Sequence, residues 1–187
     1  RSAAKEFPPG LIPVNHPLQY LPQSKRCARL SYTNENEKQN YFLLLYDRNG
    51  WLDSTIALPD VKAGTWTPHL YVAPDSDTLY MIDVAGRLAY TIPPGSGKIT
   101  RINLPAGLAQ YWPVYDSRMI KMPNGHLLFC ADLILDINWP QQSCRIIDSS
   151  FLSQCRVLAI DTVSDMVYYQ NTHPSVHQQK TFSYQYQ

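Results

Sequence analysis

The sequence predicts an all-β protein built from antiparallel sheets, about four of them, in a repeating array. Three observations lead to this prediction. A short turn motif recurs along the chain, fifteen prolines interrupt it, and no segment of twelve residues shows the 3.6-residue period of an amphipathic helix. The chain has 187 residues, of which 44% are hydrophobic and 17% charged, so it is long and apolar enough for one globular domain.

The repeated motif is clearest in two segments, DRNGWLDSTI (47–56) and DVAGRLAYTI (83–92). Both place an aspartate, a glycine, a leucine and a Thr-Ile pair at the same spacing, and apolar runs of β character stand on both sides. The corner residue recurs every 36 to 39 positions, at Gly50, Gly86, Gly125 and Ser164. We therefore expect a β-hairpin at each corner.

Three regions follow in order along the chain. Residues 1–26 are rich in proline and are expected to form an extended N-terminal segment. Residues 27–170 contain the four hairpins and the Pro- and Gly-rich links between them, and are expected to form the β domain. Residues 171–187 are expected to be a polar C-terminal tail or a closing strand.

Aspartates near the turns have a structural explanation. Asp47, Asp83 and Asp161 each precede a corner by three residues, and such a carboxylate can accept bonds from backbone N–H groups two residues on. Asp75 and Asp77, in the segment PDSD, offer oxygen ligands for calcium, but turn stabilisation is the favoured role because no EF-hand or RTX repeat accompanies them.

The period and the hairpins are typical of β-propeller blades. YVAPDSDTLYMIDVAGRL (71–88) resembles the blades of NHL-type and lactonase-like propellers. We therefore expect a small or irregular β-propeller-like array of about four blades. In size and expected architecture the chain is also similar to periplasmic immunity proteins that block the peptidoglycan amidase effectors of type VI secretion. That resemblance implies a periplasmic inhibitor that plugs a cysteine-histidine active site with a loop.

The chain has four cysteines and no CxxC spacing, which argues against a zinc site. An even number allows two disulfides. The preferred pairing joins Cys130 to Cys144, across a long excursion, and Cys27 to Cys155, between the early chain and the last unit. Four buried free thiols in a reducing compartment are the alternative.

An exposed loop is predicted at PPGSGK (93–98). It lacks the first glycine and the following helix of a phosphate-binding P-loop. Gly95, Ser96 and Gly97 would let the backbone approach a partner closely, and Ser96 and Lys98 would then enter its cleft. An ordinary crossover loop is the plainer interpretation.

Aromatic side chains suggest a second contact surface, with Tyr111 and Trp112 as the expected partner-binding pair. Four tryptophans fall within or between the repeated units: Trp51, Trp66, Trp112 and Trp139. They could stack on sugars, form a protein-binding face or pack between sheets. We expect at least two of the four to be core residues.

No motif indicates catalysis. The pair His173 and His177 lies in a polar stretch with proline and lacks the glutamate of HExxH, and no G-x-S-x-G elbow occurs. We therefore expect no catalytic residue, no metal and no cofactor. A net charge of +1 and the lack of a long apolar run predict neither nucleic-acid binding nor membrane insertion.

The expected function is non-enzymatic binding of another protein, as a periplasmic or secreted inhibitor whose exposed loop blocks a partner enzyme, for example a secreted peptidoglycan amidase. Two alternatives remain open: a carbohydrate-binding propeller that stacks sugars on Trp and Tyr, and a small propeller hydrolase or lyase.

Overall fold

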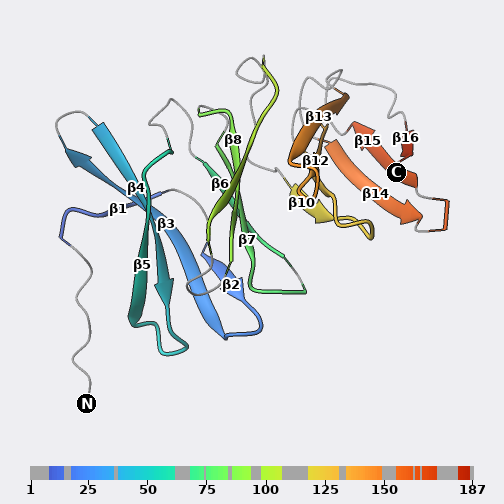
Figure 1. Cartoon of the computed structure of the whole chain (residues 1–187). Helices are drawn as coiled ribbons and strands as arrows, with labels where there is room; N and C mark the ends of the chain where they lie inside the picture. Colours follow the sequence, from blue (N-terminus) through green and yellow to red (C-terminus); the bar gives the residue numbers. More distant parts are fainter. Residues whose placement is uncertain are drawn as a thin grey trace. The chain divides into compact units, whose positions relative to one another are not determined.

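The structure is a computed structural model, and it confirms the all-β class. The described residues are 9–14, 18–35, 38–61, 68–73, 75–83, 86–93, 98–106, 118–130, 134–148, 155–161, 163–164, 166–171 and 181–185. They contain sixteen strands in four sheets of five, four, four and three strands (Figure 1). The chain divides into two compact units, residues 1–101 and 102–187, which are described separately.

The first sheet contains β1 (Ile12–Pro13), β2 (Gln19–Leu21), β3 (Arg26–Glu35), β4 (Lys38–Tyr46) and β5 (Leu52–Leu58). The long hairpin of β3 and β4 is its centre, and β5 pairs with the far side of β4. Strands β1 and β2 both pair with the free edge of β3. The segment expected to be extended and without strands thus supplies two short edge strands, a position that tolerates proline.

The second sheet runs in chain order through β6 (His69–Val72), β7 (Leu79–Asp83), β8 (Leu88–Ile92) and β9 (Thr100–Asn103). Its pairings from β6 to β8 are antiparallel. Strand β7 is buried along most of its length, because its neighbours cover both of its edges and the first sheet supplies apolar side chains to its face.

One core joins the first two sheets. Ala28 and Leu30 of β3 alternate with residues that face away, and Leu43 of β4 and Met81 of β7 are fully buried in the same cluster. Burying a side chain of this size contributes roughly 1.5–3 kcal/mol. The alternation fixes the register of β3 and β4, because a slip of one residue would turn every apolar side chain outward.

In the second unit, the third sheet contains β10 (Arg118–Lys121), β11 (Leu127–Cys130), β12 (Ile134–Asn138) and β13 (Ser143–Asp148), paired in that order. All four residues of β11 are buried, and so are the first four of β12. Continuous burial of this kind is expected of strands that are covered on both faces, and in β12 it includes the polar Asp136.

The fourth sheet contains β14 (Cys155–Asp161), β15 (Met166–Asn171) and β16 (Thr181–Gln185). Its middle strand, β15, pairs antiparallel with both neighbours. Val167 and Tyr169 of β15 share a core cluster with Leu128 and Ile134 of the third sheet. Within this unit, therefore, two sheets again bury one another's apolar side chains.

The four predicted corners all lie in turns between consecutive strands. Gly50 joins β4 to β5, Gly86 joins β7 to β8, Gly125 joins β10 to β11, and Ser164 joins β14 to β15. Gly50 and Gly125 adopt positive φ angles of 81° and 84°, which glycine adopts without strain.

The turn aspartates behave as the sequence predicts, with one difference in spacing. An Oδ1 of Asp47 accepts from the backbone N–H of Asn49, two residues on. Asp161 does the same with the N–H of Val163. Asp83 accepts from the N–H of Gly86, three residues on, at 2.9 Å.

The corners do not occupy equivalent places in the four sheets. Among the described strands, Gly50 lies in the last hairpin of the first sheet and Gly86 in the middle hairpin of the second, whereas Gly125 and Ser164 lie in the first hairpins of the third and fourth. A hairpin turn therefore recurs every 36 to 39 residues, but the sheets that contain these turns are not equivalent in strand order.

Helices long and apolar enough to cross a membrane are not found among the described residues. The same residues contain no group of three or more His, Cys, Asp or Glu side chains placed to hold a metal ion.

Candidate functional site

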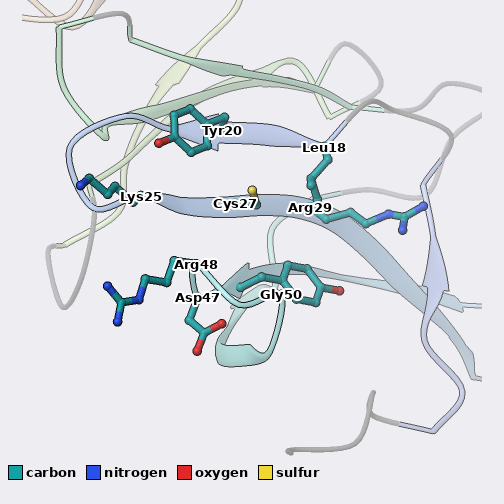
Figure 2. A pocket seen from close by; sticks show the side chains of 9 residues that line it. Leu18, Tyr20, Lys25, Cys27, Arg29, Asp47, Arg48 and Gly50 are labelled. Atoms are coloured by element: carbon teal, nitrogen blue, oxygen red, sulfur yellow. The ribbon is translucent and has the colours of Figure 1, made fainter.

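A pocket of about 690 Å³ opens on the first sheet (Figure 2). We call it the groove. Nine of the described residues line it: Leu18, Tyr20, Lys25, Cys27, Arg29, Tyr46, Asp47, Arg48 and Gly50. They come from β2, β3, the end of β4 and the turn that follows β4.

The floor of the groove is a row of three side chains on neighbouring strands. Tyr20 lies opposite Cys27, and Cys27 lies opposite Tyr46. Directly opposite residues of antiparallel strands point to the same face, and Ala28 and Leu30 take the other face into the core. Tyr20 is 58% exposed and the neighbouring Leu18 is 52% exposed. Apolar and aromatic surface therefore stands open to solvent.

Three cationic side chains surround this floor. Arg29 stands two residues after Cys27 in β3, so the period of two brings it to the same face. Lys25, in the turn before β3, and Arg48, in the turn after β4, also line the groove (Figure 2). No ion pair joins any of the three to a carboxylate within the described part of the chain.

The Arg29 guanidinium also affects Tyr46. Burial raises the pKa of the Tyr46 phenol, and the positive charge of Arg29 acts in the opposite direction. The Nε of Arg29 is itself buried and meets no hydrogen-bond acceptor among the described residues.

Asp47 is the one carboxylate among the lining residues, and the turn already uses it. Its Oδ1 accepts from the N–H groups of Asn49 at 2.8 Å and Trp51 at 2.9 Å. The hydrogen bond from Trp51 is the main reason why the pKa of Asp47 lies below its usual value. Ionised Asp47 therefore shapes the turn that carries Arg48, and the groove as a whole is cationic.

A second aspartate holds the other side of the groove. Asp77 is 2% exposed. Its two oxygens accept from the N–H of Gln23 at 2.8 Å and of Ser24 at 2.6 Å. Lys25 follows directly, in a left-handed conformation with a φ of 54° that lysine rarely adopts. The predicted local turn role of Asp77 is thus replaced by a bond to a turn more than fifty residues earlier.

These bonds decide the protonation of Asp77. Burial disfavours its charged form, but the hydrogen bonds from Ser24 and Gln23 outweigh burial, and the pKa lies below the ordinary 3.8. Asp77 therefore acts as an ionised clamp between the second sheet and the β2–β3 turn of the first.

The second unit contains a separate polar cluster. Nδ1 of His126 lies 2.8 Å from Oδ1 of buried Asp136, and Nε and Nη2 of Arg145 both lie 3.0 Å from Oδ2 of Asp136. The two strands explain the second contact, because Asp136 of β12 stands opposite Arg145 of β13. A pocket of about 310 Å³ adjoins the cluster, and Ser143 and Cys144 also line it.

A carboxylate-oriented histidine beside a thiol invites comparison with nucleophilic catalysis. Burial, aided by the negative charge of Asp136, raises the pKa of Cys144 to about 12. The thiol is therefore protonated near neutral pH, whereas the thiolate is the nucleophile. Arg145 also neutralises the carboxylate that would support an imidazolium. The arrangement favours a structural role for this cluster.

The predicted disulfide between Cys130 and Cys144 is not formed in the structure. Cys130 belongs to β11 and Cys144 to β13, and β12 lies between them in the sheet. Two strand spacings separate non-adjacent strands by about 9.5 Å, beyond the roughly 7 Å between Cα atoms that a disulfide spans.

The predicted pairing of Cys27 with Cys155 is not formed either, because Cys27 is a free thiol in the floor of the groove. The side chain of Cys155 lies outside the described residues. The two cysteines belong to different compact units.

Most of the predicted partner-binding residues cannot be placed. Gly95, Ser96, Gly97, Tyr111 and Trp112 lie outside the described residues, as do Trp66, His173 and His177. Lys98 is exposed between β8 and β9 and is not among the residues that line the groove.

The two described tryptophans do not join the core. Trp51 is 55% exposed in the turn that carries Arg48. Trp139, in the turn between β12 and β13, is half-buried.

Sequence reasoning did not find the groove. Leu18 and Tyr20 stand within the proline-rich start, Arg29 and Tyr46 belong to no motif, and Arg48 occupies a position that the two copies of the turn motif do not share. The available signal was the alternation along 25–30, in which Lys25, Cys27 and Arg29 share one face and Ala28 and Leu30 share the other. That pattern indicates a polar face on β3 and does not say which strands flank it.

No protein-family model and no curated protein sequence matches the chain. Among solved structures, it is similar to the crystal structure of a protein of unknown function from Bacteroides caccae, with a TM-score of 0.49 and 13% sequence identity. The alignment covers 91% of this chain and 60% of that one, so this chain spans about three fifths of that protein's length.

Proposed function

We propose that this protein is a non-enzymatic binding module that recognises another protein through the groove of the first sheet. One observation carries the proposal: exposed Tyr20 and Leu18 stand beside three cationic side chains around a concave floor. Aromatic residues and arginine are the side chains most enriched at the energetic centres of protein interfaces.

The support beneath the groove favours binding. Strands β3 and β4 pair without a break over nine residues, from Cys27 with Tyr46 to Glu35 with Lys38. Asp77 and Asp47 fix the two turns that carry Lys25 and Arg48. A surface that is already ordered loses little conformational entropy when a partner binds, so more of the contact energy appears as affinity.

An inhibitor of a partner enzyme is the form of this function that we favour, and an immunity protein against a secreted peptidoglycan amidase is its narrowest version. A periplasmic or secreted location and a propeller-like arrangement of the sheets belong to the same proposal. The loop of Gly95, Ser96, Gly97 and Lys98 remains a proposed second contact, because its exposed Lys98 would extend a cationic partner surface.

Capture of proteins from the native source tests the proposal. The groove variant combines Tyr20→Ala with Arg48→Glu, the loop variant is Lys98→Glu, and the control is Val163→Ser, at a residue that is 93% exposed in the β14–β15 turn. We expect the wild type and the control to retain one protein stoichiometrically, and calorimetry with that purified protein to show at least ~100-fold weaker binding by the groove variant, the scale of two interface hot spots.

The affinities of the variants identify the surface that binds the partner. Unchanged affinity of the groove variant would remove the groove from the interface, and weaker binding by the loop variant alone would move the contact to Lys98. Turnover of the captured protein or of a small substrate would contradict a non-enzymatic role.

Carbohydrate binding is the second candidate, favoured by the exposed rings of Tyr20 and Trp51. A glycan array separates the two functions. Binding to neutral glycans that is lost in Trp51→Ala and kept in Arg48→Glu would support carbohydrate recognition.

A further inference from the structure

We infer that the groove accepts an extended, acidic segment of the partner polypeptide, in which one apolar or aromatic side chain stands between carboxylates. This inference rests on the proposed function, since it names the chemistry of the partner at the same site. Four observations support it, and each concerns residues visible in Figure 2.

The first observation is the charge of the groove. Lys25, Arg29 and Arg48 line it against the single carboxylate of Asp47, whose Oδ1 is already bonded to two backbone N–H groups. The described part of the chain provides no ion-pair partner for the three cations. A ligand that carries several carboxylates therefore complements the groove, whereas a cationic one is repelled.

The second observation is the spread of the cations. Arg26 and Arg29 are three residues apart in β3, roughly 10 Å at strand spacing, and Lys25 lies one residue before Arg26, in the turn. Figure 2 shows the side chains of Lys25 and Arg29 pointing away from each other, so in this arrangement one phosphate or other small anion does not contact both. An extended peptide of four or five residues spans that length and presents a carboxylate at each end.

The third observation is the apolar floor between the cations. The rings of Tyr20 and Tyr46 stand on either side of Cys27, and Leu18 adjoins them. This floor lies between Lys25 and Arg29 in the register. An apolar side chain at the centre of the segment would cover it and remove Tyr20 and Leu18 from water.

The fourth observation is the kind of hydrogen bond that the cationic side chains of the groove can make. Lysine and arginine side chains only donate. A neutral sugar presents donors and acceptors in similar number, so its hydroxyl protons would find few acceptors here. Carboxylates only accept, and charge-assisted bonds to arginine are the strong ones.

The clamp of Asp77 adds a positioning residue to this site. Its carboxylate holds the N–H groups of Gln23 and Ser24, and Lys25 is the next residue. Asp77 does not line the groove. Loss of the clamp is therefore expected to weaken binding through the placement of Lys25, and Lys25→Ala combined with Asp77→Asn is expected to bind no more weakly than Lys25→Ala.

The test uses three labelled seven-residue peptides and the full chain. One has a central phenylalanine with two aspartates on each side, and in the others asparagines or lysines replace the aspartates. Fluorescence anisotropy at about 20 mM and about 150 mM salt reports affinity and its screening. We expect the acidic peptide to bind at least ~10-fold more tightly than the asparagine peptide, with the difference shrinking at higher salt.

Charge reversals locate the binding. Arg48→Glu and Lys25→Glu are each expected to lower the affinity for the acidic peptide at least ~10-fold. Tyr20→Ala is expected to lower this affinity by a similar factor at both salt concentrations. Lys38→Glu makes the same change in net charge at an exposed residue at the start of β4, outside the groove, and is expected to leave the affinity within about twofold.

Several results would overturn the inference. Equal binding of the acidic and asparagine peptides would remove the charge requirement, and equal effects of Lys38→Glu and Arg48→Glu would show attraction by net charge alone. Binding of polygalacturonate with the same dependence on Arg48, while no peptide binds, would assign the groove to an anionic glycan. If the captured partner needs the groove but no acidic peptide binds, the inference fails while the proposed function stands.

Discussion

Asp77 shows what a single side chain contributes in this protein. Its carboxylate is almost fully buried, yet it is ionised, because two backbone N–H groups of the first sheet donate to it. The bonded turn then carries Lys25 into the groove. One residue thus holds the second sheet to the first and also positions a side chain of the candidate binding site.

This clamp gives a stability prediction with a defined pH dependence. Asp77→Asn should lower the free energy of unfolding by about 1–3 kcal/mol at pH 7, because the amide NH₂ group meets a backbone donor. The folded-state pKa of Asp77 lies below the ordinary 3.8. Its contribution is therefore complete above pH 3.8 and is lost as the pH falls through the folded-state pKa.

Guanidinium unfolding of both proteins at pH 7 and pH 3 measures the effect. The difference between wild type and variant should be smaller at pH 3. Glu35→Gln, at an exposed position at the end of β3, is the control and should change stability by less than about 0.5 kcal/mol. A difference that stays the same at both pH values would mean that Asp77 is not ionised in the folded protein.

The other hydrogen bonds of the aspartates differ in how far apart the two bonded residues lie in the sequence. The bonds of Asp47 and Asp161 to N–H groups two residues on were predictable, because an Asx turn depends on neighbouring residues. The contact of Asp136 with Arg145 depends on the register of β12 and β13. No local pattern states that register, so the sequence alone did not reveal the cluster.

At the scale of single elements, the hairpins share a turn motif but not one turn geometry. Gly50 and Gly125 have positive φ, and an added Cβ at either would meet no atom within 4 Å. Gly86 differs, because the positive φ belongs to the next residue, Arg87, and an added Cβ at Gly86 would overlap the buried carboxylate of Asp83. Two similar sequences therefore require glycine for two different reasons.

Substitution by alanine and asparagine separates these reasons. Gly50→Ala should destabilise the protein by about 1–2 kcal/mol through backbone strain, and Gly50→Asn by less, because asparagine tolerates the left-handed region. At Gly86 the order should reverse: Gly86→Ala costs about 2–3 kcal/mol through the clash, and the larger asparagine costs more.

Urea unfolding of the four variants measures whether backbone strain or a steric clash controls each turn. If asparagine proved milder than alanine at both glycines, backbone conformation would control both turns. If alanine were milder at both, the steric surroundings would control both.

At the scale of the whole molecule, the chain is two compact units, each with two sheets and an apolar core between them. The cluster around Leu43 and Met81 belongs to residues 1–101, and the cluster around Leu128 and Val167 belongs to residues 102–187. The 36 to 39-residue period runs through both units without marking the boundary near residue 101.

Hydrogen exchange after a core deletion tests this division. Leu43→Ala removes a fully buried side chain and should lower the stability of its cluster by about 2–5 kcal/mol. Amides of β3, β4 and β7 should then exchange faster, and amides of β11 and β12 serve as the internal reference. An equal rise in both sets would show that the two clusters open in a single transition.

The sequence by itself determined the all-β class, the four hairpin corners and the local aspartate turns. Alternation, glycine, proline and Asx bonding act over a few residues, so the chain states them directly. Only the tertiary structure decided which strands pair into which sheet, and this pairing placed β12 between Cys130 and Cys144 and brought Asp77 to Gln23, 54 positions away. It also built the groove from β2, β3 and β4. The physical reason is that strands remote in sequence pair through backbone hydrogen bonds. Every residue type except proline carries both the donor and the acceptor for these bonds, so side-chain identity alone does not select the partner strand.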